Sequence, residues 1–145
     1  MVLLMALLAF GGGVQPSSGD SVGGAIAFKR PQPMSIDVGA GDRLSFVLGF
    51  DGKCTGSKLG ELWMSGVKGK QTLAVRKGKF SGRVTGTADA GDQGRTTFYW
   101  NVSGTFTGRQ VAKASVSGRA LVRSNGKVVA RCTIAKPATA KLKHT

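Results

Sequence analysis

The stretch from Phe80 to Val122 contains one short phrase three times: Phe-Ser-Gly-Arg-Val at 80–84, Val-Ser-Gly-Thr-Phe at 102–106 and Val-Ser-Gly-Arg-Ala at 116–120. In each copy, apolar residues alternate with small or polar ones. A period of two is typical of a strand with one buried face, and no helical spacing of apolar residues fits it. The phrase therefore predicts a sheet built from strands with serine and glycine at their centres.

The same alternation extends over most of the chain. We predict strands at residues 44–50, 59–67, 72–76, 80–84, 96–106, 111–123 and 127–136. Asp51-Gly52 is expected to turn the chain after the first strand, and Asn125-Gly126 matches the two-residue loop of a type I′ hairpin. The predicted fold class is all-β, with an antiparallel meander of six to seven strands that forms a small barrel or a sandwich.

Three glycines, Gly82, Gly104 and Gly118, lie at the centres of the repeated phrases and face the interior by this alternation. A glycine inside a strand usually marks a bend, a bulge or a close approach of two backbones. Strong curvature of a small barrel explains them, and so does an interior that accommodates a ligand. We favour curvature, because small residues permit coiling without requiring a ligand.

The composition along the chain divides it into four segments. We interpret 1–13 as an export signal segment, 14–41 as a flexible leader, 42–136 as a single β domain and 137–145 as a basic C-terminal tail. The apolar run Met1–Phe10 is too short to span a bilayer but matches the core of a signal peptide. The alternative is a buried or frayed helix of a cytosolic protein. We expect a secreted or cell-envelope-associated monomer without a transmembrane span in the mature chain.

Charge is the strongest compositional signal. The chain has 21 Lys and Arg residues and 7 Asp and Glu residues, which gives a net charge of +14. No carboxylate side chain follows Asp92. Such a field attracts polyanions, including anionic cell-wall polymers, lipid head groups and nucleic acid. The alternative is that the charge serves solubility alone.

Several basic residues and one tyrosine fall on the predicted outer face of neighbouring strands, where they could form one polyanion-binding stripe. They are Lys79, Arg83, Tyr99, Lys113, Arg119, Arg123 and Arg131. An outward tyrosine can stack on a base or a sugar. The sequence thus favours a secreted, non-enzymatic β module that binds an anionic polymer or cell-envelope component. A nucleic-acid-binding β-barrel is the alternative function, and an ordinary solvated sheet face is the alternative to any site.

Two cysteines, Cys54 and Cys132, are far apart in the sequence. In an oxidising compartment they would form a disulfide that ties the region after the first strand to the last strand. The alternative is a pair of unbonded small apolar residues in a cytosolic fold. We expect no metal site, because His144 is the only histidine and two thiolates do not complete a tetrahedral shell.

Catalytic residues are not evident. Nucleophilic catalysis needs a base beside the nucleophile, and His144 lies outside any predicted strand. The acidic residues that could form a carboxylate pair stand nearly all beside glycines, where turn formation explains them. They are Asp37, Asp42, Asp51, Glu61, Asp89 and Asp92. We predict that the protein is not an enzyme and has no cofactor.

The order of these phrases resembles a group of small secreted all-β proteins that are common in actinobacteria. The resemblance rests on residues 77–82, 102–107 and 112–118 and on a single late cysteine, Cys132. It covers roughly 44–135 and implies export and a β-meander. It carries over no functional residues, and the chain departs from the group by lacking a Thr-Gly and a tryptophan after the cysteine.

Overall fold

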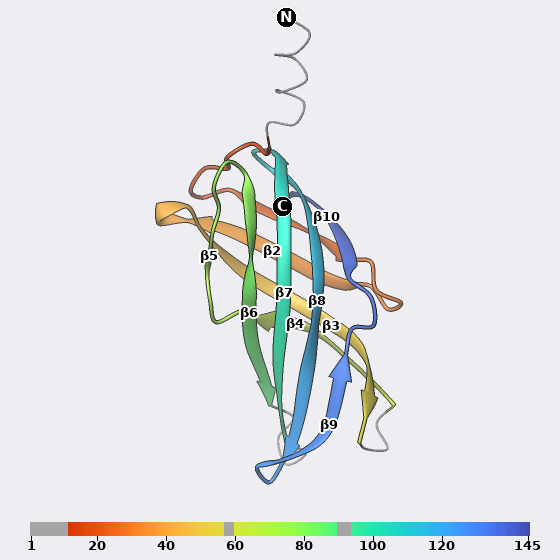
Figure 1. Ribbon diagram of the computed structural model, residues 1–145. Coiled ribbons are helices and arrows are strands. Elements are labelled where there is room, and N and C mark those ends of the chain that lie inside the picture. Colours follow the sequence, from red (N-terminus) through yellow and green to blue (C-terminus); the bar gives the residue numbers. More distant parts are fainter. Residues whose placement is uncertain (1–11, 57–59, 90–93) are drawn as a thin grey trace, which may run out of the picture.

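The computed structural model describes residues 12–56, 60–89 and 94–145, and Figure 1 shows that the described chain is an antiparallel β structure. Its sheet contains ten strands. They are β1 (Ser21–Ile26), β2 (Gln32–Gly39), β3 (Arg43–Thr55), β4 (Glu61–Lys68), β5 (Leu73–Ala74), β6 (Lys79–Asp89), β7 (Arg95–Gly108), β8 (Val111–Ser124), β9 (Lys127–Thr133) and β10 (Ala138–His144). A single 3-10 turn, Ala40–Asp42, joins β2 to β3. Residues 1–11 of the export segment predicted at 1–13 lie outside the described residues.

The strands close into a ring, which decides between the two predicted architectures in favour of a barrel. Hydrogen bonds run from β1 through β2, β3, β9, β8 and β10 and return to β1. From this ring, β7 and β6 extend the sheet beyond β8, while β4 and β5 pair with β3. The fold therefore consists of two meanders, β1–β4 and β6–β9, which long-range strand pairings join. The sequence had predicted a single meander.

The predicted count of six to seven strands is too low because two segments were interpreted wrongly. The leader at 14–41 contains β1 and β2, and the basic tail at 137–145 contains β10. In β2, Met34, Ile36 and Val38 are buried and alternate with polar or exposed positions. The Pro and Gly residues around these strands suggested a flexible chain, but burial of the apolar residues stabilises them as parts of the barrel.

Aromatic side chains fill the barrel interior. Phe46 and Phe50 of β3 meet Phe98, Trp100 and Phe106 of β7 in one cluster, and each is at most 1% exposed. The indole Nε1 of Trp100 donates a 3.0 Å hydrogen bond to the carbonyl oxygen of Gly49, so the long strand β7 is tied to β3 across the core. The inward faces predicted for these strands are confirmed.

The interior glycines have structural roles. Gly118 has φ of +151°, and a Cβ there would collide with the carbonyl oxygen of Tyr99. It lies where the partner of β8 changes from β10, which pairs up to Val116, to β9, which pairs from Arg119. At Gly104, the ring of Phe80 occupies the space that a Cβ would need. Curvature and close packing thus account for both positions.

The predicted Asn125-Gly126 hairpin is confirmed. Both residues have positive φ, +51° and +77°, as a type I′ turn requires. Ser124 pairs with Lys127 on either side of the turn.

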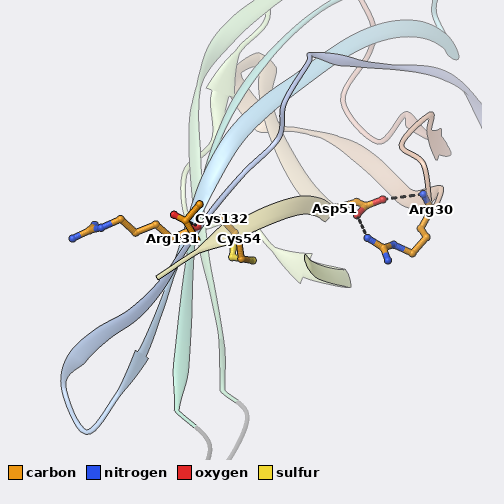
Figure 2. The surroundings of a disulfide bond; sticks show 6 residues. Arg30, Asp51, Cys54, Arg131 and Cys132 are labelled. Carbon is orange, nitrogen blue, oxygen red and sulfur yellow. Dashed lines mark hydrogen bonds and ion pairs between the residues drawn. A yellow bond between two sulfur atoms is a disulfide. The ribbon is translucent and has the colours of Figure 1, made fainter. Parts of the chain in front are cut away.

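Cys54 and Cys132 form a disulfide, as one of the two sequence alternatives predicted. The bond joins β3 to β9 at directly opposed positions (Figure 2). It closes a loop with a sequence separation of 78 residues. In the chain-entropy model, a loop of that length stabilises the fold by about 4 kcal/mol. The cross-link therefore reinforces the short β3–β9 pairing through which the ring closes.

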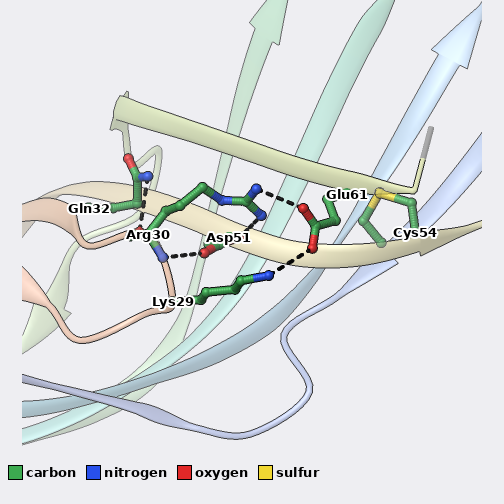
Figure 3. A network of polar contacts seen from close by, with 7 residues as sticks. Lys29, Arg30, Gln32, Asp51, Cys54 and Glu61 are labelled. Carbon is green, nitrogen blue, oxygen red and sulfur yellow. Dashed lines mark hydrogen bonds and ion pairs between the residues drawn. A yellow bond between two sulfur atoms is a disulfide. The ribbon is translucent and has the colours of Figure 1, made fainter.

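The predicted turn at Asp51-Gly52 is wrong, because β3 continues through both residues. Asp51 is instead buried and accepts hydrogen bonds from Arg30, one from the backbone N (2.8 Å) and one from Nη2 (2.6 Å). Arg30 also donates to Glu61 at 2.7 Å, and its guanidinium lies 4.1 Å from the ring centroid of Trp63. Figure 3 shows the contacts of Arg30 with Asp51 and Glu61. We call these three residues and Trp63 the Arg30 clamp. It fixes the β1–β2 loop against β3 and β4.

Opposing effects act on the Asp51 carboxyl. Burial tends to raise its pKa, but the hydrogen bonds from Arg30, together with the positive charges of Arg30 and Lys29, outweigh burial and hold the pKa below the ordinary value of 3.8. The pKa of Glu61 is likewise lowered, first by its hydrogen bond from Arg30. The clamp thus favours both carboxylates in their charged form.

Candidate functional site

The outer face of β6, β7, β8 and β10 carries hydroxyl and cationic side chains in register. Ser81 pairs with Ser103, Ser103 with Ser115, and Ser115 with Thr139, so four hydroxyl residues cross four adjacent strands. Figure 1 shows β6, β7 and β8 running side by side over much of the molecule. Small side chains at these positions leave a low floor between longer ones.

Cations border this floor on both sides. One neighbouring row contains Lys79, Lys113 and Lys141, with Thr105 between the first two. On the other side, Arg83 pairs with Asn101, and Arg119 follows one row further along. Long basic side chains therefore rise at the edges of a hydroxyl-lined surface.

Three adjoining hollows, of about 970, 410 and 320 Å³, follow this face. The first and second share Ser81, Ser103 and Ser115. The second and third share three further residues, Arg83, Asn101 and Ser117. Because they share linings, we treat the hollows as one channel, which we call the basic groove.

Most of the predicted stripe lines the basic groove. Lys79 and Lys113 line its first hollow, Arg83 its second and third, and Tyr99 and Arg119 its third. Arg123 and Arg131 line none of its three hollows. Arg123 Nη1 donates to the Thr97 hydroxyl at 3.3 Å. Arg131 borders a separate hollow beside Thr55 and extends away from the Arg30 clamp (Figure 2).

One face of the Tyr99 ring is covered by a neighbouring side chain. The guanidinium of Arg119, its register partner, lies over one face with Cζ 4.5 Å from the ring centroid. The other aromatic residues of β6 and β7, namely Phe80, Phe98, Trp100 and Phe106, are buried in the core. In the part of the chain that the structure describes, the groove therefore combines charge and hydroxyl groups with an apolar lining that includes Ala114, Ala140 and the edge of the buried Phe80.

Sequence reasoning missed Arg76, Thr139 and Lys141, which also line the first hollow. Two of these residues lie in β10, within the segment interpreted as a tail. Its alternation of buried Ala138, Ala140 and Leu142 with exposed residues could have revealed the strand. Arg76 ends the strand predicted at 72–76, but β5 covers only Leu73–Ala74, and Arg76 instead forms an isolated bridge with Lys79.

The cations of the groove are electrostatically uncompensated. Among the residues that the structure describes, no carboxylate lines any of the three hollows. Within residues 12–56, 60–89 and 94–145, the ion pairs involve Lys29, Arg30, Arg95 and Arg109, and none involves a groove cation. Like charges held along one channel raise the local concentration of anions.

Within the same described ranges, no group of three or more His, Cys, Asp or Glu side chains could hold a metal ion. None of the helical structure described is long and apolar enough to cross a membrane. No protein-family model, curated protein or solved structure matches the chain.

Proposed function

We propose that the protein is an exported, non-enzymatic binding module that holds an anionic polymer in the basic groove. The uncompensated cations around the hydroxyl floor carry this proposal. A polyanion lying in the groove would neutralise several of them at once and release its own counterions, which is the main source of affinity in such complexes. The cell-envelope polymers expected from the sequence are ligands of this class.

Export is supported by two observations of different kinds. Met1–Phe10 has the apolar composition of a signal-peptide core. The Cys54–Cys132 disulfide is typical of proteins that mature in an oxidising compartment.

The proposal is tested by salt-dependent retention on an immobilised polyanion. The double substitution Arg83→Glu plus Arg119→Glu places two carboxylates in the groove and should weaken binding by about 10- to 100-fold at low salt. Both side chains are exposed, so the fold should be preserved.

The matched control is Lys68→Glu plus Lys127→Glu, at exposed positions that line none of the three hollows. Each double variant replaces two positive charges by two negative ones, so the net charge falls by 4, from +14 to +10. Equal loss of binding in both variants would show that net charge, not the groove, causes retention. Elution of the groove variant at the wild-type salt concentration would also refute the proposal.

A further inference from the structure

On two strands of the basic groove, β6 and β8, hydroxyl side chains separate the cations on the outer face. On β6, Lys79 and Arg83 have Ser81 between them on the same face. On β8, Lys113 and Arg119 have Ser115 and Ser117 between them. At about 3.3 Å per residue, the two cations are about 13 Å apart on β6 and about 20 Å apart on β8. The positive charges are therefore separated by hydroxyl-bearing surface.

The hydroxyl groups of the floor are available to a ligand. Among the described residues, no side-chain hydrogen bond to another protein group involves Ser81, Ser103, Ser115 or Thr139. Ser81, Ser103 and Thr139 are exposed, and Ser115 is half-buried. A serine hydroxyl both donates and accepts, so each can bind a hydroxyl group or an anionic oxygen.

The same surface offers little to a nucleobase. Proteins that hold single-stranded nucleic acid usually stack bases on exposed aromatic rings. In the described part of the groove, the one outward ring is Tyr99, and Arg119 covers one of its faces. A nucleic acid would therefore gain mainly from its phosphates, while a chain with hydroxyl groups between its anions would use the cations and the floor together.

On this basis we propose that the groove binds a polyol-phosphate chain, in which phosphates are separated by hydroxyl-bearing units. This inference rests on the proposed function and specifies its ligand. The phosphates lie beside the lysines and arginines, and the intervening hydroxyl groups bind the row Ser81, Ser103, Ser115 and Thr139. The floor thus provides selectivity, and the cations provide most of the affinity.

The test compares three probes with equal numbers of phosphates: poly(glycerol phosphate), inorganic polyphosphate and oligo(dT). Polyphosphate has the charge without hydroxyl groups, and oligo(dT) has phosphates with bases. The variant is Ser103→Ala plus Ser115→Ala, which removes two floor hydroxyls and no charge. It should weaken binding of poly(glycerol phosphate) about tenfold, since two hydrogen bonds are lost, and weaken binding of the other two probes by less than about twofold, because the cations hold their phosphates.

The matched control is Ser45→Ala plus Ser65→Ala, two exposed serines of β3 and β4 that line none of the hollows. It should leave the affinity for all three probes unchanged. Thermal unfolding of both variants checks that the fold is preserved.

The outcomes separate the two proposals. Selective loss for poly(glycerol phosphate) supports the polyol-phosphate ligand. Equal loss for all three probes, no loss for any, or a loss confined to oligo(dT) overturns that ligand but leaves the polyanion groove standing. If the unsubstituted protein shows no salt-dependent binding to any of the three probes, both proposals are refuted: the polyanion-binding groove and its polyol-phosphate ligand.

Discussion

The Arg30 clamp and the basic groove both concentrate cationic side chains on the barrel, but their electrostatic surroundings are opposite. In the clamp, Arg30 donates to Asp51 and Glu61 (Figure 3). Its guanidinium also lies against Trp63. In the groove, the described cations have no carboxylate partner. Asp51 lies three residues before the disulfide cysteine Cys54 in β3, so the clamp lies near a covalent cross-link as well.

This difference separates cations that stabilise the fold from cations that are free to bind. An arginine that is paired and partly buried cannot be detached from its carboxylates without leaving a buried charge. An exposed lysine or arginine without a partner contributes little to stability. The clamp should therefore respond to substitution through the free energy of unfolding, and the groove through ligand affinity.

The largest expected effect is on the clamp. Asp51→Ala should lower the free energy of unfolding by about 3 kcal/mol, because it removes the carboxylate that pairs with Arg30 at a buried position. Urea denaturation measures the change. Asp89→Ala is the control, since Asp89 pairs with Arg95 at 3.5 Å on the surface and should contribute less than about 0.5 kcal/mol. Similar losses in the two variants would contradict the distinction between buried and exposed pairs.

A smaller effect is expected from acid. The pKa of Asp51 is lowered from 3.8 and that of Glu61 from 4.5, so both carboxyls bind protons more readily in the unfolded chain. Their stabilising contribution is complete above these ordinary values and is lost as the pH falls through the lower pKa values of the folded state. Unfolding curves recorded below about pH 4.5 should show falling stability. Asp51→Asn should flatten that dependence, and an unchanged slope would show that the clamp does not cause it.

The smallest effect on stability is expected in the groove. Arg119→Ala should change the free energy of unfolding by less than about 0.5 kcal/mol, because the side chain is exposed and has no carboxylate partner in the described chain. It should nevertheless lower the slope of log affinity against log salt by about 1 for a bound polyphosphate. A large loss of stability with an unchanged slope would assign Arg119 a structural role, through its contact with Tyr99.

Much of the barrel was predictable because one face of each long strand is apolar. The alternation in β7 and β8 correctly predicted that Phe98, Trp100 and Val116 point inward and that Lys113 and Arg119 point outward. The same reasoning failed for β1 and β10, whose short alternations lie among glycine, proline and basic residues. Such segments are strands because partners far away in the sequence pair with them, and local propensity does not contain that information.

The amino-acid sequence alone determined the strand faces, the Asn125-Gly126 turn and the excess of positive charge, since each depends on neighbouring residues or on composition. Only the tertiary structure decided which cations share a surface. Register brings Thr139 and Lys141 beside Ser115 and Lys113, while Arg123 and Arg131 lie outside the groove. The tertiary structure also shows that Asp51, which was expected in a turn, is the buried partner of Arg30. These relations depend on how β strands distant in sequence align across the closed barrel, which local periodicity does not specify.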